Sequence, residues 1–165
     1  MSVTDELLAS AQDYSTGFSH GDLPMPPGRQ VAVVACMDAR LNVYGLLGLS
    51  EGEAHVIRNA GGVISEDAIR SLAISQRLLG TREIVLLHHS DCGMLTFTDD
   101  EFKAQIEADT GIRPAWAAEA FGDPAEDIRQ SLRRLAVNPF IPHREQVRGF
   151  VYSVTDGTLS EVTDA

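Results

Sequence analysis

Two short aliphatic runs, each followed closely by polar residues, decide what this chain can build. Residues 31–35 read Val-Ala-Val-Val-Ala, and residues 84–87 read Ile-Val-Leu-Leu. Runs of this length that are β-branched and aliphatic and end abruptly predict strands, the first over about 30–35. If the two strands lie side by side in a parallel sheet, their carboxyl ends meet at one edge. The sequence therefore predicts that the polar residues after both runs gather at that edge.

The residues after the two runs are of the kinds that bind metal ions. Cys36 follows the first run, whereas His89 and Cys92 follow the second and fit on one turn. Two sulfurs and one imidazole suit zinc, and three protein ligands leave a fourth position for water. That is the arrangement of a catalytic rather than a structural zinc site. We therefore expect one zinc ion per chain, held by Cys36, His89 and Cys92.

A carboxylate and a guanidinium follow the first expected ligand at a regular spacing. Because side chains alternate along an extended chain, Cys36, Asp38 and Arg40 face one side. Asp38 could itself become the fourth ligand and close the site. The planar fork of Arg40 can instead grip this carboxylate and hold it beside the metal. Asp38 would then accept a hydrogen bond from a metal-bound water and favour hydroxide, which makes Asp38 and Arg40 the expected catalytic residues.

Simpler explanations exist for each of these residues alone. Buried free cysteines are common and usually inert, and a histidine at a strand end is usually a satisfied polar group. The combination favours a metal site, because the chain has only two cysteines and both lie just after hydrophobic strands. A redox dithiol is disfavoured by the absence of a Cys-x-x-Cys pair. A closed zinc site used only for partner binding lacks a fourth ligand, unless Asp38 rotates in.

The other histidines and Asp91 have no function assigned by any motif. Alternation along the strand turns His88 to the opposite side from His89, which favours a structural role for His88. His55, His143 and Asp91 receive no role.

Length, charge and cysteine content limit the classes of protein. With 165 residues, the chain is expected to form one domain, residues 1–165, with a sizeable core. A formal net charge of −11 argues against nucleic-acid binding, which needs a basic surface. Two cysteines do not form a disulfide scaffold, which favours a reducing cytoplasm. No signal-peptide pattern appears, and no apolar run approaches the roughly 20 residues of a membrane span. We therefore expect a cytoplasmic protein without nucleic-acid or membrane partners.

The first residues predict an amphipathic helix over residues 4–18. A helix with such an apolar stripe must bury it, either on its own domain or against a second subunit, and the sequence leaves both alternatives open. The stripe consists of Leu7, Leu8, Ala11, Tyr14 and Phe18.

A glycine-containing segment follows an expected strand at 54–57. Residues 58–62 read Arg-Asn-Ala-Gly-Gly and lead to a helix that Ser65 caps. A tight turn of this kind can direct backbone N–H groups toward a ligand. Its spacing matches no phosphate-binding motif, which argues against nucleotide binding. Either the glycines serve turn geometry alone, or the segment is a loop next to the substrate. The loop residues concerned are Arg58, Asn59, Gly61 and Gly62.

The remaining elements alternate in a way that predicts an α/β fold. Helices are expected over residues 42–47, 66–79, 98–111 and 123–137, an irregular segment over 112–122, and strands over 147–154 and 158–162. Strand–helix–strand order implies right-handed crossovers and a parallel sheet, and the Asp-Gly hairpin adds an antiparallel edge. We expect a three-layer α/β domain in which about four parallel strands and one antiparallel edge strand are flanked by helices. The apolar face of helix 66–79 is expected to contain Ala68, Ile69, Leu72, Ala73, Leu78 and Leu79.

Together, these residues resemble the motifs of the β-class carbonic anhydrases, and compact bacterial members most closely. The matching elements are Cys36-Met-Asp38-Ala-Arg40, Arg58-Asn-Ala-Gly-Gly62 and His89-Ser-Asp-Cys92-Gly93. The resemblance covers about residues 28–155 and implies zinc held by the three expected ligands, with Asp38 and Arg40 as a dyad. It also implies a homodimer, or a dimer of dimers, in which helix 4–18 is the dimerisation arm that embraces the neighbouring subunit.

The resemblance implies reversible hydration of carbon dioxide to bicarbonate and a proton by zinc-bound hydroxide. Because two thiolates cancel the formal charge of Zn²⁺, the metal should acidify its water less than an all-histidine site does, and activity should rise toward alkaline pH. The alternative is a hydrolase of carbonyl sulfide or carbon disulfide that uses the same site. Pocket width and access decide between them, and these are not readable from the sequence.

Overall fold

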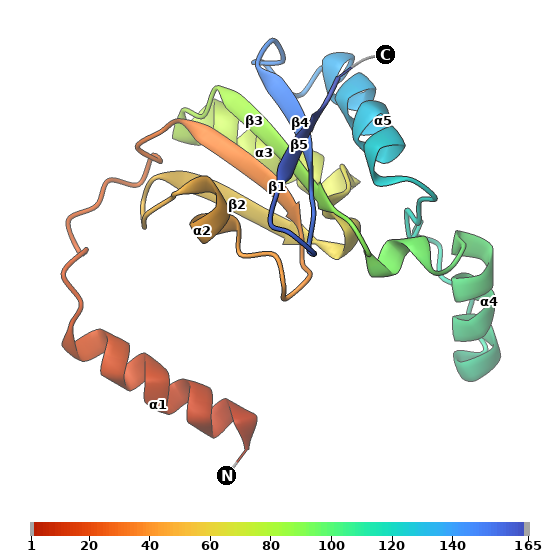
Figure 1. Cartoon of the computed structure of the whole chain (residues 1–165), viewed down its shortest axis with the longest axis horizontal. Helices are drawn as coiled ribbons and strands as arrows, with labels where there is room; N and C mark the ends of the chain where they lie inside the picture. Colours follow the sequence, from red (N-terminus) through yellow and green to blue (C-terminus); the bar gives the residue numbers. More distant parts are fainter. Residues whose placement is uncertain (1, 164–165) are drawn as a thin grey trace.

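The computed structural model describes residues 2–163, which build a five-stranded sheet flanked by helices (Figure 1). The strands lie in the order β2-β1-β3-β4-β5, with β2, β1, β3 and β4 parallel and β5 antiparallel to β4. Their bounds are Val31–Cys36 (β1), Ala54–Asn59 (β2), Glu83–His89 (β3), Val147–Tyr152 (β4) and Leu159–Val162 (β5). The expected fold class, with four parallel strands and one antiparallel edge strand, is confirmed.

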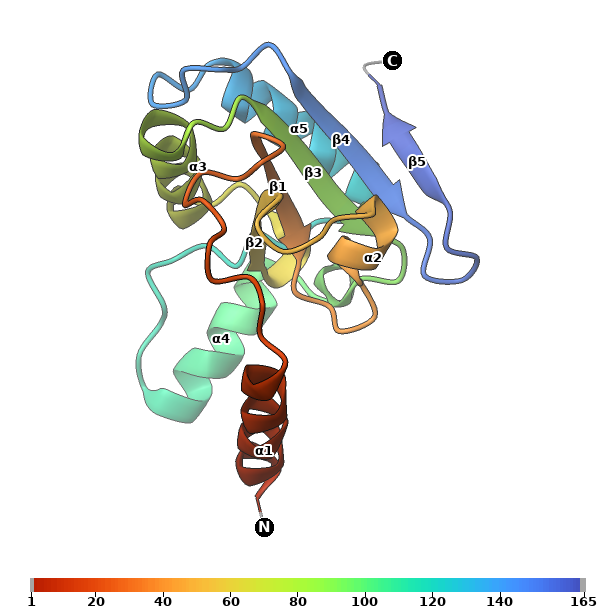
Figure 2. The same cartoon turned by 90° about the vertical axis from the view of Figure 1, so that its left-hand side faces the viewer.

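Helices lie on both faces of the sheet. Their bounds are Val3–Thr16 (α1), Val43–Leu47 (α2), Glu66–Leu79 (α3), Asp99–Thr110 (α4) and Pro124–Ala136 (α5). α3 and α5 cover one face, and α2 lies on the other (Figure 2). Ala32 and Val34 of β1 pack toward α3 and α5, while Val33 and Ala35 pack on the side of α2. The near-continuous aliphatic run of β1 follows from this burial on both faces.

Capping residues set the helix boundaries where the sequence indicated. The side chain of Ser65 accepts a hydrogen bond from the N–H of Ala68 at the start of α3, and Gly80 ends that helix in the left-handed conformation. Thr98 and Glu101 form a capping box at the start of α4. These side chains satisfy N–H groups that a helix end leaves without partners, so the boundaries are fixed locally.

One expectation about α3 is wrong. The sequence pattern places Leu78 on its apolar face, but 76% of this residue is exposed. The inward position one turn after Leu72 is taken by Gln76, whose side chain is bonded to both backbone groups of His143 at 2.9 Å. A polar side chain with both partners supplied can occupy the buried stripe, and the helical period then carries Leu78 to the solvent side.

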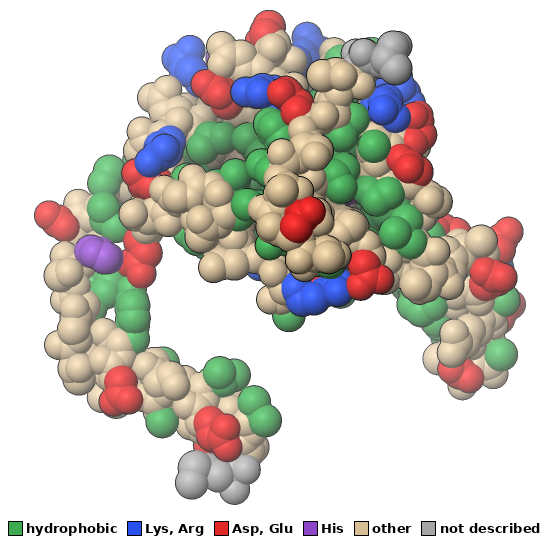
Figure 3. Space-filling model, in the orientation of Figure 1, with side chains coloured by type: hydrophobic (Ala, Val, Ile, Leu, Met, Phe, Trp, Pro, Cys, Tyr) green, Lys and Arg blue, Asp and Glu red, His purple; other side chains and the backbone are tan. Residues whose placement is uncertain are grey.

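α1 extends away from the sheet on a long connecting segment (Figure 1). It contains no buried residue, and Leu7 and Leu8 are 65% and 63% exposed. Apolar side chains are visible along it in Figure 3. Its C-terminal half is tied to the body through Tyr14, whose hydroxyl donates to Glu51 at 2.6 Å. The structure therefore does not show the first alternative, in which the apolar stripe of this helix packs on its own domain. None of the described helices is long and apolar enough to cross a membrane.

Candidate metal centre

Three metal-competent side chains meet at the carboxyl edge of the sheet, where the adjacent strands β1 and β3 end. One ligand atom each from Cys36, His89 and Cys92 lies within 4.8 Å of the other two, and all three residues are buried. The sulfurs of Cys36 and Cys92 are 3.9 Å apart. Two thiolates bound tetrahedrally to zinc at about 2.3 Å would be separated by about 3.8 Å, so the spacing fits this ion.

The imidazole of His89 is oriented for a metal by its own backbone. Its Nδ1–H donates to the carbonyl oxygen of Ser90 at 2.8 Å. Nε2 is then the unprotonated nitrogen, and it is buried without a hydrogen-bond partner among the described residues. A buried polar atom without a partner is costly, and a backbone-held tautomer is the usual arrangement of a histidine that binds metal. The donor set therefore fits zinc.

The two thiols differ in how easily they ionise. Although burial opposes ionisation of Cys36, the neighbouring His89 and the backbone N–H groups of Asp38 and Gly61 together lower the pKa of Cys36 to about 7. Burial raises the pKa of Cys92 to about 11, and the nearby sulfur of Cys36 adds to this. The surroundings thus favour ionisation of Cys36, whereas ionisation of Cys92 needs a bound cation.

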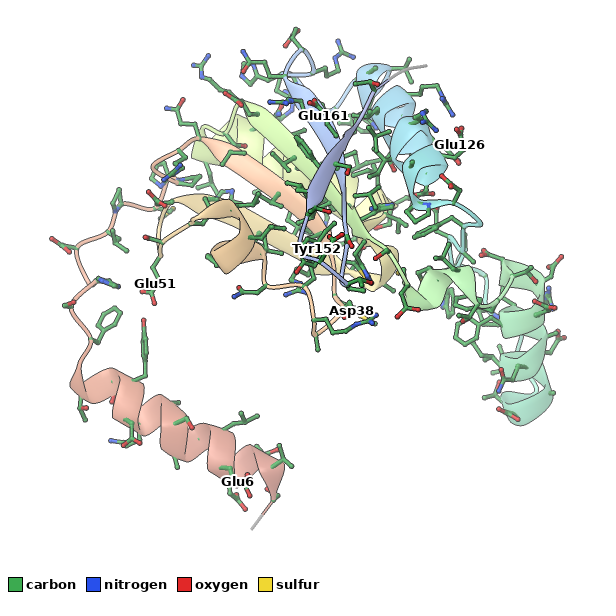
Figure 4. The ribbon with its side chains drawn as sticks, viewed as in Figure 1. Glu6, Asp38, Glu51, Glu126, Tyr152 and Glu161 are labelled. Carbon is green, nitrogen blue, oxygen red and sulfur yellow. The ribbon has the colours of Figure 1, made fainter. Side chains whose placement is uncertain are left out.

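Asp38 stands beside the three ligand atoms in a fixed orientation. Arg40 donates from Nε to Oδ1 at 3.0 Å and from Nη2 to Oδ2 at 2.8 Å, and its backbone N–H also donates to Oδ1 at 2.8 Å. These bonds hold the pKa of Asp38 far below its usual range. Oδ2 lies 3.7 Å from Nε2 of His89. Asp38 is nevertheless not a member of the metal-competent group formed by Cys36, His89 and Cys92. Figure 4 shows Asp38 just beyond the carboxyl end of the sheet.

The glycine-containing segment, residues 58–62, lies against the same site, and its side chains bond to different parts of the backbone. The guanidinium of Arg58 donates to the carbonyl oxygens of Cys36, at 2.8 and 3.0 Å, and of Asp38, at 2.7 Å. Asn59 closes the turn through two bonds of 2.9 Å to the backbone of Val63. Arg58 therefore stabilises the backbone between the first ligand and Asp38.

Gly62 crosses the ends of β1 and β3 with a positive φ of 73°. A Cβ at this position would lie 2.7 Å from the backbone nitrogen of Cys36 and 3.1 Å from the carbonyl oxygen of Leu87. Backbone atoms of two strands cannot move aside, so only glycine fits. This close approach places the turn next to the cysteine ligand.

We expect Gly62→Ala to lower the free energy of unfolding by about 3 kcal/mol or more. Gly80→Ala is the matched control, because Gly80 has a φ of 76° but no neighbouring atom within 4 Å. It should cost only about 1–2 kcal/mol, the strain of the left-handed conformation alone. Urea unfolding of both variants measures the difference, and equal losses would show that crowding at Gly62 is unimportant.

A cavity of about 600 Å³ extends outward from the cysteines. Its walls are mostly apolar, and Phe97, Phe102 and Trp116 form an aromatic side. The segment 112–122, expected to be irregular, is irregular. Its backbone is fixed by the carboxylate of Asp99, which accepts N–H bonds from Ala118, Glu119 and Ala120. The cavity offers a small apolar substrate a path to the ligand cluster.

Two contacts near the site had no signal in the sequence. His88 is buried, its Nε2–H donates to Asp127 at 2.7 Å, and its ring stacks on Phe121 at 5.1 Å. This agrees with a structural role. Asp91 received no role, yet Nη1 of Arg40 donates to its carboxylate at 2.7 Å and Nη2 donates to its carbonyl oxygen at 2.9 Å. A contact across 51 positions of sequence is visible only in the folded chain.

Known proteins are similar to this chain in sequence and in fold. The family model described as carbonic anhydrase matches residues 31–159. Over 163 residues, the chain is 64% identical to Beta-carbonic anhydrase 1 of Mycobacterium tuberculosis, with 99% of both proteins covered. The chain belongs to the β-carbonic anhydrase family. A solved carbonic anhydrase from Streptococcus mutans superposes with a TM-score of 0.90 at 42% identity and 99% coverage of both chains.

The chain is also similar to enzymes named for a sulfur substrate. A carbon disulfide hydrolase of Acidianus sp. is 32% identical over 175 residues, which cover 91% of this chain and 84% of that protein. The sequence identity to this hydrolase, 32%, is half the 64% identity to the mycobacterial β-carbonic anhydrase.

Proposed function

We propose that this protein hydrates carbon dioxide reversibly to bicarbonate and a proton, with zinc held by Cys36, His89 and Cys92. The observation that carries the proposal is the buried Nε2 of His89, which has no hydrogen-bond partner among residues 2–163 and belongs to a residue grouped with two cysteines, in a chain of the β-carbonic anhydrase family. When bound, zinc acts as a Lewis acid that makes water a nucleophile at moderate pH.

The protein's own residues would orient the reactants. Because Arg40 keeps Asp38 ionised, this carboxylate can only accept a hydrogen bond. It therefore selects and aligns a protic nucleophile on the open side of the ligand cluster. Arg58 holds the backbone from Cys36 to Asp38 in place. The mostly apolar cavity suits a small apolar substrate such as carbon dioxide.

The competing function is hydrolysis of carbonyl sulfide or carbon disulfide at the same site. The identity of 64% to a β-carbonic anhydrase, against 32% to a carbon disulfide hydrolase, favours carbon dioxide. Stopped-flow assays with all three substrates, run alongside zinc content per chain, separate the two functions. The proposal predicts about one zinc per chain and the largest kcat/KM with carbon dioxide. A larger kcat/KM with either sulfur compound would overturn it.

We further propose that the protein is a cytoplasmic homodimer or dimer of dimers in which α1 packs on a neighbouring subunit. Support comes from the exposed apolar stripe of α1, because a helix that leaves such a stripe in water is unusual for a folded monomer. Two free thiols that must stay reduced to bind metal suit the cytoplasm.

The double variant Leu7→Glu/Leu8→Glu is expected to weaken dimerisation about 100-fold or more, because two leucines lose their apolar contact area. Ala9→Glu/Thr16→Glu is the matched control, since it adds the same charge on the opposite side of the helix and should leave the assembly unchanged. Analytical ultracentrifugation measures both. A wild-type protein that sediments as a monomer would contradict the role of α1.

Turnover is expected to rise with pH from neutral to about pH 9, because the thiolates of Cys36 and Cys92 offset the charge of a divalent cation. Asp38 does not cause this rise: its pKa is lowered by the hydrogen bonds from Arg40, so it is already ionised throughout this range. Stopped-flow measurement of kcat/KM against pH tests the prediction. A flat profile would be inconsistent with a site of two thiolates.

A further inference from the structure

Asp91 lies between His89 and Cys92 in the sequence, in the loop after β3, and forms hydrogen bonds with Arg40. Its carboxylate accepts from Nη1 of Arg40 at 2.7 Å, and its carbonyl oxygen accepts from Nη2 at 2.9 Å. The other donors of the same guanidinium reach Asp38. Arg40 thus connects the loop after β1 with the loop after β3: the first loop directly follows the ligand Cys36, and the second contains the ligand Cys92.

The backbone at Asp91 is shaped for this contact. Asp91 has a φ of 54°, in the left-handed region that residues with a side chain seldom adopt. Its carbonyl group faces Arg40 in this conformation, and the side chain reaches the same guanidinium. Two acceptors from one residue therefore converge on one cation, at a position next to Cys92.

We propose that Asp91 is a positioning residue: it fixes Arg40 so that Arg40 keeps Asp38 beside the metal position and off it. The inference rests on the proposed function, because it assumes a metal at Cys36, His89 and Cys92. Asp38 is close enough to matter, with Oδ2 at 3.7 Å from Nε2 of His89. An arginine bound to Asp38 alone could move together with that carboxylate. An arginine also anchored on the β3 loop cannot.

The expected effect is moderate, because the contact is partly in water. The side chain of Asp91 is 78% exposed and that of Arg40 is 49% exposed. Exposed ion pairs change equilibria only severalfold, whereas charge-assisted bonds with a defined geometry reach somewhat further. Loss of the Asp91 carboxylate should therefore shift the balance between open and Asp38-closed sites by about three- to tenfold.

Asp91→Gly is the informative variant. Glycine adopts a φ of 54° without strain, so the carbonyl contact to Arg40 is kept and only the carboxylate is lost. Gln30→Gly is the matched control, because Gln30 also has a φ of 54° but precedes β1 at the opposite end of the sheet. Asp91→Asn retains an acceptor for Nη1 and should stay within about twofold of the wild type.

The test uses azide as the probe, titrated into the full-length, cobalt-substituted protein at one fixed alkaline pH. Azide takes the open coordination position, so a site closed by Asp38 binds it less tightly. The apparent azide Kd scales with one plus the ratio of closed to open sites, so we expect Asp91→Gly to raise this Kd and lower kcat by up to about tenfold, the full factor where closed sites predominate, while Gln30→Gly changes neither. In an Asp38→Ala background, Asp91→Gly should have no further effect on azide binding, because no carboxylate remains to close the site.

An unchanged azide Kd in Asp91→Gly would overturn the inference, and so would a weakened affinity that persists in the Asp38→Ala background. Failure of the proposed function looks different: the wild-type zinc protein would then bind metal but not hydrate carbon dioxide. The azide titration would still report on Asp91 in that case.

Discussion

Replacing Asp38 with asparagine is expected to lower kcat/KM for carbon dioxide hydration about 100-fold or more while zinc content stays at the wild-type level. The substitution preserves the shape of the side chain but removes its charge. It also puts an NH₂ group where Asp38 now has an oxygen that accepts from Arg40. The amide must then either face the donors of Arg40 or direct its own donors toward the ligand cluster. In the first orientation donors face donors, so the amide is no longer held by Arg40; in the second it donates to a bound nucleophile and no longer restricts it to the proton-donating role.

Zinc should be retained because Asp38 is not one of the three side chains whose ligand atoms meet. Stopped-flow kinetics and metal analysis of the same preparation measure both quantities. Asp67→Asn is a suitable control, since Asp67 also pairs with an arginine at 2.8 Å but lies on the exposed surface of α3. It should leave kcat/KM within about twofold. Near-normal turnover in Asp38→Asn would remove Asp38 from the reaction, and loss of zinc would show that it is a ligand.

The fold was predictable because its main signals are local. The aliphatic runs of β1 and β3 indicate strands buried on both faces, and the caps at Ser65, Thr98 and Asp123 mark where helices begin. Parallel pairing then follows from the order of strands and helices. The same reasoning brings Cys36 and His89 to one edge, because each lies at the carboxyl end of a strand and those strands are neighbours.

Local pattern does not determine which distant side chains meet. Leu78 is exposed because the buried position on α3 belongs to Gln76, whose partners lie on the backbone of His143. The guanidinium of Arg58 bonds to the backbone carbonyls of Cys36 and Asp38, which lie about 20 positions away in the sequence and which no local pattern indicated as its partners. The contact of Asp91 with Arg40 likewise depends on the left-handed backbone conformation of Asp91, which the neighbouring residues do not predict.

His89→Asn is expected to lower zinc content to less than about a tenth of an ion per chain and to reduce carbon dioxide hydration to background. His89 supplies the only nitrogen of the three-residue group, and its Nε2 is buried without another partner in the described part of the chain. Asparagine is too short to reach the same point. The remaining pair, Cys36 and Cys92, would have to ionise together at 3.9 Å, where each thiolate opposes the other.

Thermal unfolding gives a second measurement that does not depend on activity. Zinc at about 1,000 times its Kd adds about 4 kcal/mol to the free energy of unfolding if it binds only the folded chain. For a chain of this size, that corresponds to a rise in Tm of about 10 °C. A chelator should therefore lower the Tm of the wild type by about this amount and leave His89→Asn unchanged. His143→Asn is the control, because the bonds of His143 to Gln76 use backbone atoms only and its zinc and Tm should match the wild type. If His89→Asn kept full zinc and the same response to chelator, the ion would have to be bound elsewhere. The burial of His89 Nε2 without a partner among the described residues would then need another explanation.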